Sequence, residues 1–541
     1  MSIGLSVLSF IACAPAPEGA AGAILNGDAF ELTIRPSYLE SQADMIDEIT
    51  DLEVLIHQSD GTSVRESLLT LGSSEYTHDN FPPLDNVTLT LVGSNDGGVV
   101  FHGTSRPVTV NEGDHTVIIF VGRNGQSEPM PHPLPEPNAM GTLVPVGDGK
   151  FFGFGGTSQG LYSNSSTQES FAYDLHQMAA GEPTSRRLES PFPASSEGLG
   201  RIGHTATLLS GTSAYAGQIL LVGGADRFLD EDGRLSSQAV LSTQTVLFDP
   251  STETFASTQS LTHPRMGHTA TAFENGNVVV AGGFAQPDTD TSIVPYVEIY
   301  DPTEERWTVP QEGFQVGGIF HAAAPLGDRG VLICGGIHPT LSVSDQCHLV
   351  TPTGAIQTAP ALPKPLLHAS MTPLNDGTIL LTGGLSPETA AISSDLLMDM
   401  EATRSAWLYK DDEWRSLPSM SLARANHNTA VLPGGRVVIA GGVTKVDMGS
   451  DRGLTPYSGL LFDSTDAIAC VEVYDPESKS FQKWDSCTVD SQSSTLSQPT
   501  ALPQMATDPF FGTLIAGGIT SDGAHPTDEV VLFYPHFDDL Y

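Results

Sequence analysis

Short apolar runs alternate with turn residues along the whole chain, and this pattern predicts an all-β protein. Between Ile24 and Arg123 the runs include Phe30–Ile34, Leu52–His57 and Thr116–Val121. Runs of this length, separated by Gly- and Asp-rich turns, are typical of two packed antiparallel sheets. We therefore expect a small β-sandwich domain over residues 24–123.

A proline-rich segment follows this region. Between Ser127 and Pro137 every second residue from Pro129 onward is a proline. Such a sequence favours a stiff, extended backbone, and its missing amide donors restrict it to edge pairing in a sheet. We expect residues 124–139 to form a linker.

The remaining chain, residues 140–541, repeats one unit. An apolar strand ends in a Gly-Gly pair about every 60 residues, and a period of this order indicates a propeller. Tight-turn residues such as Asn275-Gly276 precede the pairs, and aromatic-Asp-Pro sequences such as the one at Tyr300 follow several of them. Each unit is expected to be one blade of four antiparallel strands, a to d. The second glycines of the pairs are Gly156, Gly224, Gly283, Gly336, Gly384, Gly442 and Gly518.

This unit resembles the kelch repeat, which joins a hairpin ending in Gly-Gly to a tyrosine and then a tryptophan at short spacing. Blades one, four and five depart from the pattern, and in blade five Tyr409 and Trp414 are only five residues apart. The resemblance implies a circular seven-bladed kelch-type β-propeller with aromatic side chains between the blades. The N-terminal sandwich is immunoglobulin-like or fibronectin-like by pattern alone. We expect blade seven to close the ring by packing on blade one, helped by residues 126–138, with a stub of outer strand after Asp538.

The charge balance narrows the classes of partner. The chain has 541 residues, with 23 Lys plus Arg against 64 Asp plus Glu, and a formal net charge of −41. This charge opposes binding to nucleic-acid phosphates and to anionic lipid. An acidic coat for solubility is the simplest interpretation, and divalent-cation binding is the alternative. We expect no cofactor, although two acidic pairs resemble calcium loops without the full ligand spacing: Asp230 with Asp232, and Asp288 with Asp290.

The N-terminus resembles a bacterial lipoprotein signal. The apolar run 1–12 is too short for a membrane-spanning helix and ends in Phe10-Ile-Ala directly before Cys13. The resemblance implies a signal peptide over 1–12, a diacylglyceryl group on Cys13 and a flexible tether over 13–23. An ordinary cleaved signal with an incidental cysteine is the alternative. With the sandwich and the propeller, the chain resembles exported lipoproteins of δ-proteobacterial (myxobacterial) type, and Ala14 favours the outer membrane or cell surface.

The other four cysteines form two local pairs. Cys334 and Cys347 are 13 residues apart, and Cys470 and Cys487 are 17 apart. Each pair falls on neighbouring strands of one blade, where Cα atoms lie about 4.5–5.5 Å apart and within reach of a disulfide. Two disulfides agree with export, and four buried free thiols are the alternative.

Histidines recur at the start of strand a. A ring of imidazoles around the axis would suggest a metal site, but residues repeated once per blade lie far apart unless they line the axis. We expect these imidazoles to satisfy backbone groups between blades instead. Arginines precede three of them by three residues, at Arg201, Arg265 and Arg424. The histidines are His204, His268, His321, His368 and His427.

No motif establishes an enzyme. Galactose oxidase, a copper enzyme with a kelch-type propeller, needs a Tyr-His pair, and the chain has no Tyr-His dipeptide. The b–c loops are long and rich in Asp, Ser and Thr, and long loops on a rigid scaffold commonly carry function. These loops are at about 225–242, 284–294, 385–404 and 443–469.

We therefore expect an exported, lipid-anchored binding or interaction module. Its ligand, a protein or a glycan, is expected on the face formed by the b–c loops. Membrane contact would be through the lipid anchor alone, without a nucleic-acid partner. The alternative is an enzyme acting on a sugar or glycan, like a mutarotase or epimerase, with its site in the central channel.

Overall fold

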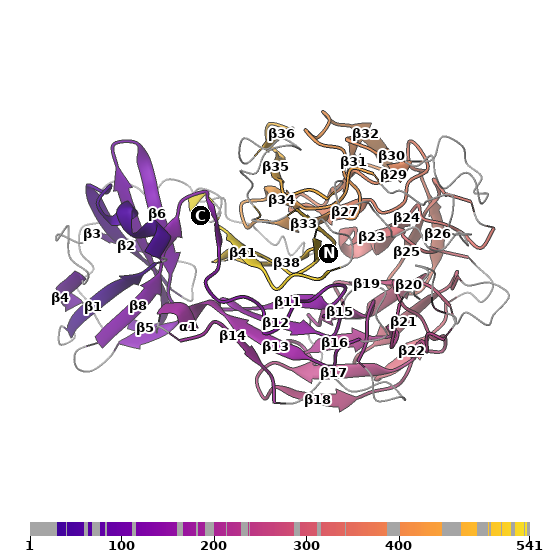
Figure 1. Cartoon of the computed structure of the whole chain (residues 1–541), viewed down its shortest axis with the longest axis horizontal. Coiled ribbons are helices and arrows are strands. Elements are labelled where there is room, and N and C mark those ends of the chain that lie inside the picture. Colours follow the sequence, from indigo (N-terminus) through magenta and orange to yellow (C-terminus); the bar gives the residue numbers. More distant parts are fainter. Residues whose placement is uncertain are drawn as a thin grey trace, which may run out of the picture. The chain divides into compact units, whose positions relative to one another are not determined.

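The computed structural model describes residues 30–537 except 39, 59–62, 68–75, 82–83, 111–114, 160–165, 180–181, 190–199, 212–213, 229–235, 237, 286–292, 311–314, 341, 387–400, 446–466, 484–495, 497–498, 510, 521–524 and 535 (Figure 1). The described residues fall into two compact units, 30–124 with 536–537 and 125–534. The regular secondary structure of both units is almost entirely β-strand, so the chain is an all-β protein. None of the helices in these ranges is long and apolar enough to traverse a bilayer.

The first unit is a β-sandwich. One sheet has the order β4-β1-β8 and the other β3-β2-β5-β6-β9, with β7 beside β5. Residues alternate between core and surface along β2, and apolar side chains from both sheets meet in one core that includes Leu32, Val54 and Leu89. The elements are β1 (Phe30–Ser37), η1 (Glu40–Ile46), β2 (Asp51–His57), β3 (Ser63–Ser67), β4 (Tyr76–Phe81), β5 (Leu84–Asn95), β6 (Gly98–Thr104), β7 (Val108–Val110), β8 (His115–Phe120) and β9 (Gly122–Arg123).

The second unit is a seven-bladed β-propeller of the kelch type (Figure 1). Its innermost strands touch in cyclic order from β11 to β38, and β38 touches β11 again, so the ring is closed. Each of the first six blades is one four-stranded antiparallel sheet made from consecutive sequence. Blades one to three are β11 (Thr142–Gly147), β12 (Lys150–Phe154), β13 (Ser170–Asp174), β14 (Ser185–Arg187); β15 (Thr205–Leu208), β16 (Ile219–Val222), β17 (Thr245–Asp249), β18 (Thr254–Ser257); and β19 (Thr269–Ala272), β20 (Val278–Ala281), β21 (Val297–Asp301), β22 (Arg306–Thr308).

Blades four to six follow the same plan. They are β23 (Ala322–Pro325), β24 (Val331–Cys334), β25 (Cys347–Val350), β26 (Ile356–Ala359); β27 (Ser370–Pro373), β28 (Ile379–Thr382), β31 (Ala406–Lys410), β32 (Glu413–Ser416); and β33 (Asn428–Val431), β34 (Val437–Ala440), β35 (Val471–Asp475), β36 (Ser480–Lys483). Short further elements are α1 (Leu175–Ala179), η2 (Gly327–Arg329), β29 (Leu385–Ser386), β30 (Glu401–Ala402), β37 (Thr500–Ala501) and β40 (Ile519–Thr520).

Blade seven takes its outer strand from the proline-rich segment. Its sheet has the order β10-β41-β39-β38, where β10 is Ser127–Pro129, β38 is Gln504–Asp508, β39 is Gly512–Ala516 and β41 is Val530–Phe533. The Met130 amide donates to the carbonyl oxygen of Val530 (2.8 Å), and the Tyr534 amide donates to that of Gln126 (2.7 Å). Pro129 lies between these two bonded positions on an edge strand, where its missing donor costs no ladder bond.

The N-terminal end of the propeller sequence therefore supplies the outer strand of the last blade. The expectation of closure mainly by packing is corrected, because backbone hydrogen bonds between the two ends of the propeller sequence also close the ring. The expected stub after Asp538 lies outside the described residues. Phe537 belongs to the sandwich unit, where its ring lies 5.6 Å from that of His102 and its amide donates to the Asn124 side chain (2.7 Å). Phe537 therefore lies in the sandwich and is not part of an outer strand of blade seven.

The aromatic residues of the repeat are cross-strand pairs of strands c and d. Tyr300 lies opposite Trp307, with ring centroids 5.1 Å apart, and the Trp307 indole donates to the carbonyl oxygen of Gln259 in blade two. Tyr409 lies opposite Trp414 in the same way (4.9 Å), although these residues are closer in sequence. The departure in blade five therefore shortens the turn and leaves the pair intact.

Candidate functional site: the central cavity of the propeller

Seven residues, one from each blade, surround the channel in the left-handed backbone conformation. Each lies two residues before an inner strand, and their φ angles are between 52° and 65°. Amides donate to the carbonyl oxygen of the preceding blade from Gly203, Gly267, His368, Asn426 and Leu502, at 2.8–3.3 Å. We call this set the left-handed ring: Met140, Gly203, Gly267, Phe320, His368, Asn426 and Leu502.

The left-handed ring is strained at its non-glycine members. A residue with a Cβ in this conformation costs roughly 1–2 kcal/mol, and asparagine tolerates it best. Met140, Phe320 and Leu502 have no such tolerance. Backbone hydrogen bonds between members of the set, such as that of the His368 amide to Phe320, help to offset this cost, and strain that persists in this way commonly marks functional sites.

Four histidines follow the ring, each one residue before an inner strand. We call His204, His268, His321 and His427 the blade histidines. The first three each share a hydrogen bond between Nε2 and a threonine hydroxyl at the start of the preceding blade: Thr142 (3.1 Å), Thr205 (2.9 Å) and Thr269 (2.8 Å). His427 also bonds to a threonine hydroxyl of the preceding blade, but this residue is Thr382 (2.9 Å), the last residue of β28. These imidazoles connect neighbouring blades, mainly through hydroxyl groups.

Burial fixes the charge state of the blade histidines. It lowers the pKa of His204 and His427 to about 3 and that of His321 to about 4. It also lowers the pKa of His268 well below the ordinary value, with a further contribution from the nearby Arg265 cation. All four are neutral at physiological pH.

The Gly-Gly pairs accommodate these histidines. A Cβ on Gly223 would lie 2.6 Å from the carbonyl oxygen of Arg265 and 2.8 Å from Cε1 of His268 in the next blade. A Cβ on Gly224 would lie 2.9 Å from Cβ of His204 in the same blade. Both contacts are closer than side chains tolerate, and both glycines have positive φ. The pair is therefore a packing requirement of the blade junction.

His368 occupies a different position from the other four histidines. It lies two residues before its inner strand, where it belongs to the left-handed ring, and Ala369 stands at the position of the blade histidines. Its imidazole stacks on Phe320, with centroids 4.0 Å apart. The sequence pattern predicted that all five histidines occupy equivalent positions. In the structure His368 lies one residue further from its inner strand than the other four do.

Two blades contain a buried ion pair that the sequence analysis missed. Arg265 is fully buried and donates to Oε1 of Glu298 (2.6 Å) and to the carbonyl oxygens of Gly282 and Tyr296 (both 3.0 Å). Glu298 also accepts from the Thr262 amide (2.7 Å). Burial opposes ionisation of Glu298, but Arg265 and this amide hold its carboxyl pKa below the usual value.

Blade six repeats the arrangement, with Arg424 donating to Glu472 at 2.7 Å. In blade two the Arg201 guanidinium donates instead to the Gln244 side chain. The sequence held a signal for the two ion pairs. In both blades a glutamate interrupts the apolar strand c three residues before an aspartate, in Val297-Glu-Ile-Tyr-Asp and Val471-Glu-Val-Tyr-Asp, and both blades carry the preceding arginine.

A cavity of about 390 Å³ lies at the starts of the inner strands of blades one, two, three, six and seven. Its polar lining includes Thr142, Thr205, Asn426, Asn428 and Gln504, together with three of the blade histidines. Its apolar lining includes methionine, leucine and proline side chains. Among the described residues that line it, none carries a formal charge, in contrast to the strongly acidic chain as a whole.

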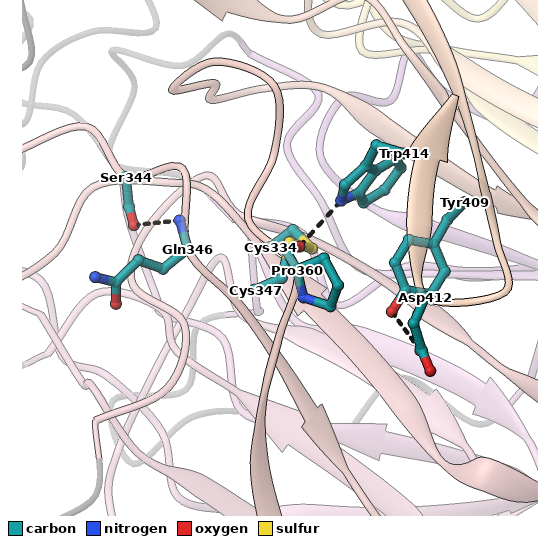
Figure 2. Close-up of a disulfide and its surroundings, with 8 residues drawn as sticks. All are labelled: Cys334, Ser344, Gln346, Cys347, Pro360, Tyr409, Asp412 and Trp414. Atoms are coloured by element: carbon teal, nitrogen blue, oxygen red, sulfur yellow. Dashed lines mark hydrogen bonds between the residues drawn. A yellow bond between two sulfur atoms is a disulfide. The ribbon is translucent and has the colours of Figure 1, made fainter. Parts of the chain in front are cut away.

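The disulfide predicted between Cys334 and Cys347 is present. The two residues lie directly opposite each other on β24 and β25, with Cα atoms 4.2 Å apart. Figure 2 shows the bond near Trp414 of the next blade, whose indole donates to the carbonyl oxygen of Pro360 (3.1 Å). Cys470 is a buried half-cystine, but Cys487 lies outside the described residues, so that pairing stays a prediction.

Several other predicted sites lie outside the described residues. They are Cys13 with the signal and tether, the acidic residues Asp230, Asp232, Asp288 and Asp290, and the centres of the four long b–c loops. Within the described ranges, no group of three or more His, Cys, Asp or Glu side chains is arranged to hold a metal ion.

Comparisons with known proteins support the fold. No family model matches the chain. It is 25% identical over 260 residues to tRNA wybutosine-synthesizing protein 4 of Saccharomyces cerevisiae (strain ATCC 204508 / S288c). The matched region covers 44% of this chain and 34% of the yeast protein. The chain thus spans about a third of the length of this curated relative.

Two solved structures are similar to the chain. A fungal alcohol oxidase of the AA5 family, in complex with copper, has 15% identity and a TM-score of 0.52, with 76% of each chain covered. YjhT has 16% identity and a TM-score of 0.41, with 58% of this chain and 92% of that chain covered. At such low identity the alcohol oxidase shares a fold with this chain, and nothing more follows from the likeness.

Proposed function

We propose that the propeller is a binding module whose ligand occupies the central cavity. The observation that carries this proposal is the uncharged lining of the cavity, formed by threonine, asparagine, glutamine and neutral imidazole groups. Small-molecule sites are typically cavities of roughly 300–1,000 Å³ with a few polar groups on a mainly apolar wall. A volume of about 390 Å³ suits a small ligand.

An enzyme acting on a sugar is the second candidate, because the similar alcohol oxidase has a propeller fold. General acid–base catalysis is most effective when the pKa of the catalytic group lies near the working pH. The blade histidines at the cavity have pKa values far below that range, and their Nε2 atoms bond to threonine. This chemistry supports binding over proton transfer by the described lining residues.

We also propose that the protein is located outside the cytoplasm. The Cys334–Cys347 disulfide supports an oxidising, extracytoplasmic location, and we propose a lipid anchor at Cys13 on the outer membrane or cell surface. The net charge of −41 opposes binding to tRNA phosphates, so we propose no tRNA-related function from the similarity to the yeast protein. Labelling with a radioactive fatty acid in a bacterial host should mark the full chain and leave Cys13→Ser unlabelled; label on that variant would refute the anchor.

A cavity-filling variant tests where the ligand binds. Ala270 lines the cavity, and Ala323 holds the same position in blade four without lining it. Binding of the full chain to a glycan array and to free monosaccharides should be lost in Ala270→Leu and retained in Ala323→Leu. Equal binding by both variants would contradict the cavity as the site. Conversion of a bound sugar, followed by proton NMR, would favour the enzyme.

A further inference from the structure

We infer that Asn426 and Gln504 form a hydrogen-bonding pair in the cavity that selects a small uncharged polyol, such as a monosaccharide, through one of its hydroxyl groups. This inference rests on the proposed function, because it names the ligand class and the residues for the same cavity. The two residues come from neighbouring blades, six and seven, and both line the cavity.

Both side chains are more than nine-tenths buried, with 5% of Asn426 and 6% of Gln504 exposed. Within the described residues, Nδ2 of Asn426 and Oε1 of Gln504 have no hydrogen-bond partner. The rest of the Gln504 amide is fixed, because its Nε2 donates to Oδ1 of Asn138 (2.7 Å). Buried amides are nearly always satisfied, so an unpartnered donor and an unpartnered acceptor on one cavity wall indicate groups held for a ligand.

The backbone keeps these two groups near each other. The Leu502 amide, two residues before Gln504, donates to the carbonyl oxygen of Asn426 at 3.1 Å. Both Asn426 and Leu502 are members of the left-handed ring, with φ of 54° and 52°. The Asn426 amide also donates to the carbonyl oxygen of His368 (3.3 Å), so backbone bonds to both neighbouring blades hold Asn426 in place, and such preorganisation favours ligand binding.

The chemistry of the pair defines the ligand class. One N–H donor and one carbonyl acceptor together satisfy a group that both accepts and donates, and a hydroxyl does both. A carboxylate or phosphate only accepts, so it would leave Oε1 of Gln504 unpaired and repelled. An ammonium only donates, so it would leave Nδ2 of Asn426 unpaired. The uncharged wall has no counter-ion for either one.

Isothermal titration of the full chain tests the inference, with D-glucose, D-galactose and myo-inositol as neutral probes and D-glucuronate and D-glucosamine as charged ones. We expect at least one neutral probe to bind and the charged analogues to bind at least tenfold more weakly. Asn426→Asp keeps the shape and the tolerance for positive φ but replaces the donor with an anionic oxygen. It should weaken neutral binding at least tenfold.

Asn426→Gly provides a second variant, because glycine is unstrained at this φ. Its Tm should equal or exceed that of the wild type while binding is weakened, a combination that a purely structural asparagine would not produce. Asn86→Gly is the matched control, since Asn86 also has positive φ (51°) but lies in the sandwich, and it should bind like the wild type. If no probe binds the wild type, the proposed function fails. If a probe binds the wild type and both Asn426 variants equally, or if charged probes bind best, only the present inference is overturned.

Discussion

The Arg265–Glu298 pair makes a quantitative prediction about the stability of the propeller. We consider Glu298→Gln, which keeps the size of the side chain and removes its charge. The guanidinium would then remain fully buried with two carbonyl oxygens and an amide oxygen as its acceptors, and the glutamine NH₂ would compete with the Thr262 amide, which also donates. Removing one partner of a buried ion pair costs about 3–5 kcal/mol, because the other charge stays buried.

The expected shift in melting temperature follows from the size of the unit. At roughly 2.1 cal/mol/K of unfolding entropy per residue, a propeller of about 400 residues has an unfolding entropy of about 0.8 kcal/mol/K. A loss of about 3–5 kcal/mol then lowers Tm by about 4–6 °C. Replacing both residues with apolar ones should not restore stability, because the Thr262 amide and the carbonyl oxygens of Gly282 and Tyr296 would lose their partners.

Differential scanning calorimetry of the full chain measures this shift. The control is Asp411→Asn, which breaks the exposed pair of Asp411 and Arg415, whose side chains are 70% and 51% accessible. Exposed pairs contribute at most about 1 kcal/mol, so this control should melt within about 1 °C of the wild type. If Glu298→Gln melts as high as the control, or if Arg265→Met/Glu298→Leu melts above the wild type, the ion pair does not stabilise the blade as argued.

Three further predictions concern the same unit. Burial lowers the pKa of His204, His321 and His427 from 6.5 to about 3–4, so the unfolded chain takes up protons first; the stability that this provides is complete above pH 6.5 and falls toward pH 4 by up to about 1.4 kcal/mol per pH unit for each of the three histidines. His427→Gln should therefore make Tm depend less steeply on pH, and an unchanged slope would contradict this. Cys334→Ala/Cys347→Ala should cost about 3 kcal/mol for a loop of 13 residues, measured by chemical denaturation, and an unaltered midpoint would argue against it. Glu128→Pro removes a ladder donor of β10 and should lower Tm, whereas Ser127→Pro, at an unbonded position, should have little effect; equal effects would refute the closure by β10.

Features that depend on local sequence were predictable. The Gly-Gly period defined the blades because each junction needs two glycines against the next blade and its own inner strand, as at Gly223 and Gly224. The disulfide at Cys334 was predictable because its partner lies across a single hairpin. The aromatic pairs were predictable for the same reason, since Tyr300 and Trp307 face each other across one turn.

Features that depend on contacts between distant segments needed the tertiary structure. The outer strand of blade seven comes from Ser127–Pro129, about 400 residues before the strand with which it pairs, and no local pattern encodes such a partner. The candidate site has the same origin. Asn426 and Gln504 become a pair only when blades six and seven pack side by side and bring the starts of their inner strands together. The sequence by itself determined the blade, because strand alternation and tight turns act within tens of residues. Only the assembled ring of blades determined the cavity, because its wall is built from one short segment of each of five blades. Which groups a lining residue can bind therefore depends on residues of other blades, which are distant in the sequence.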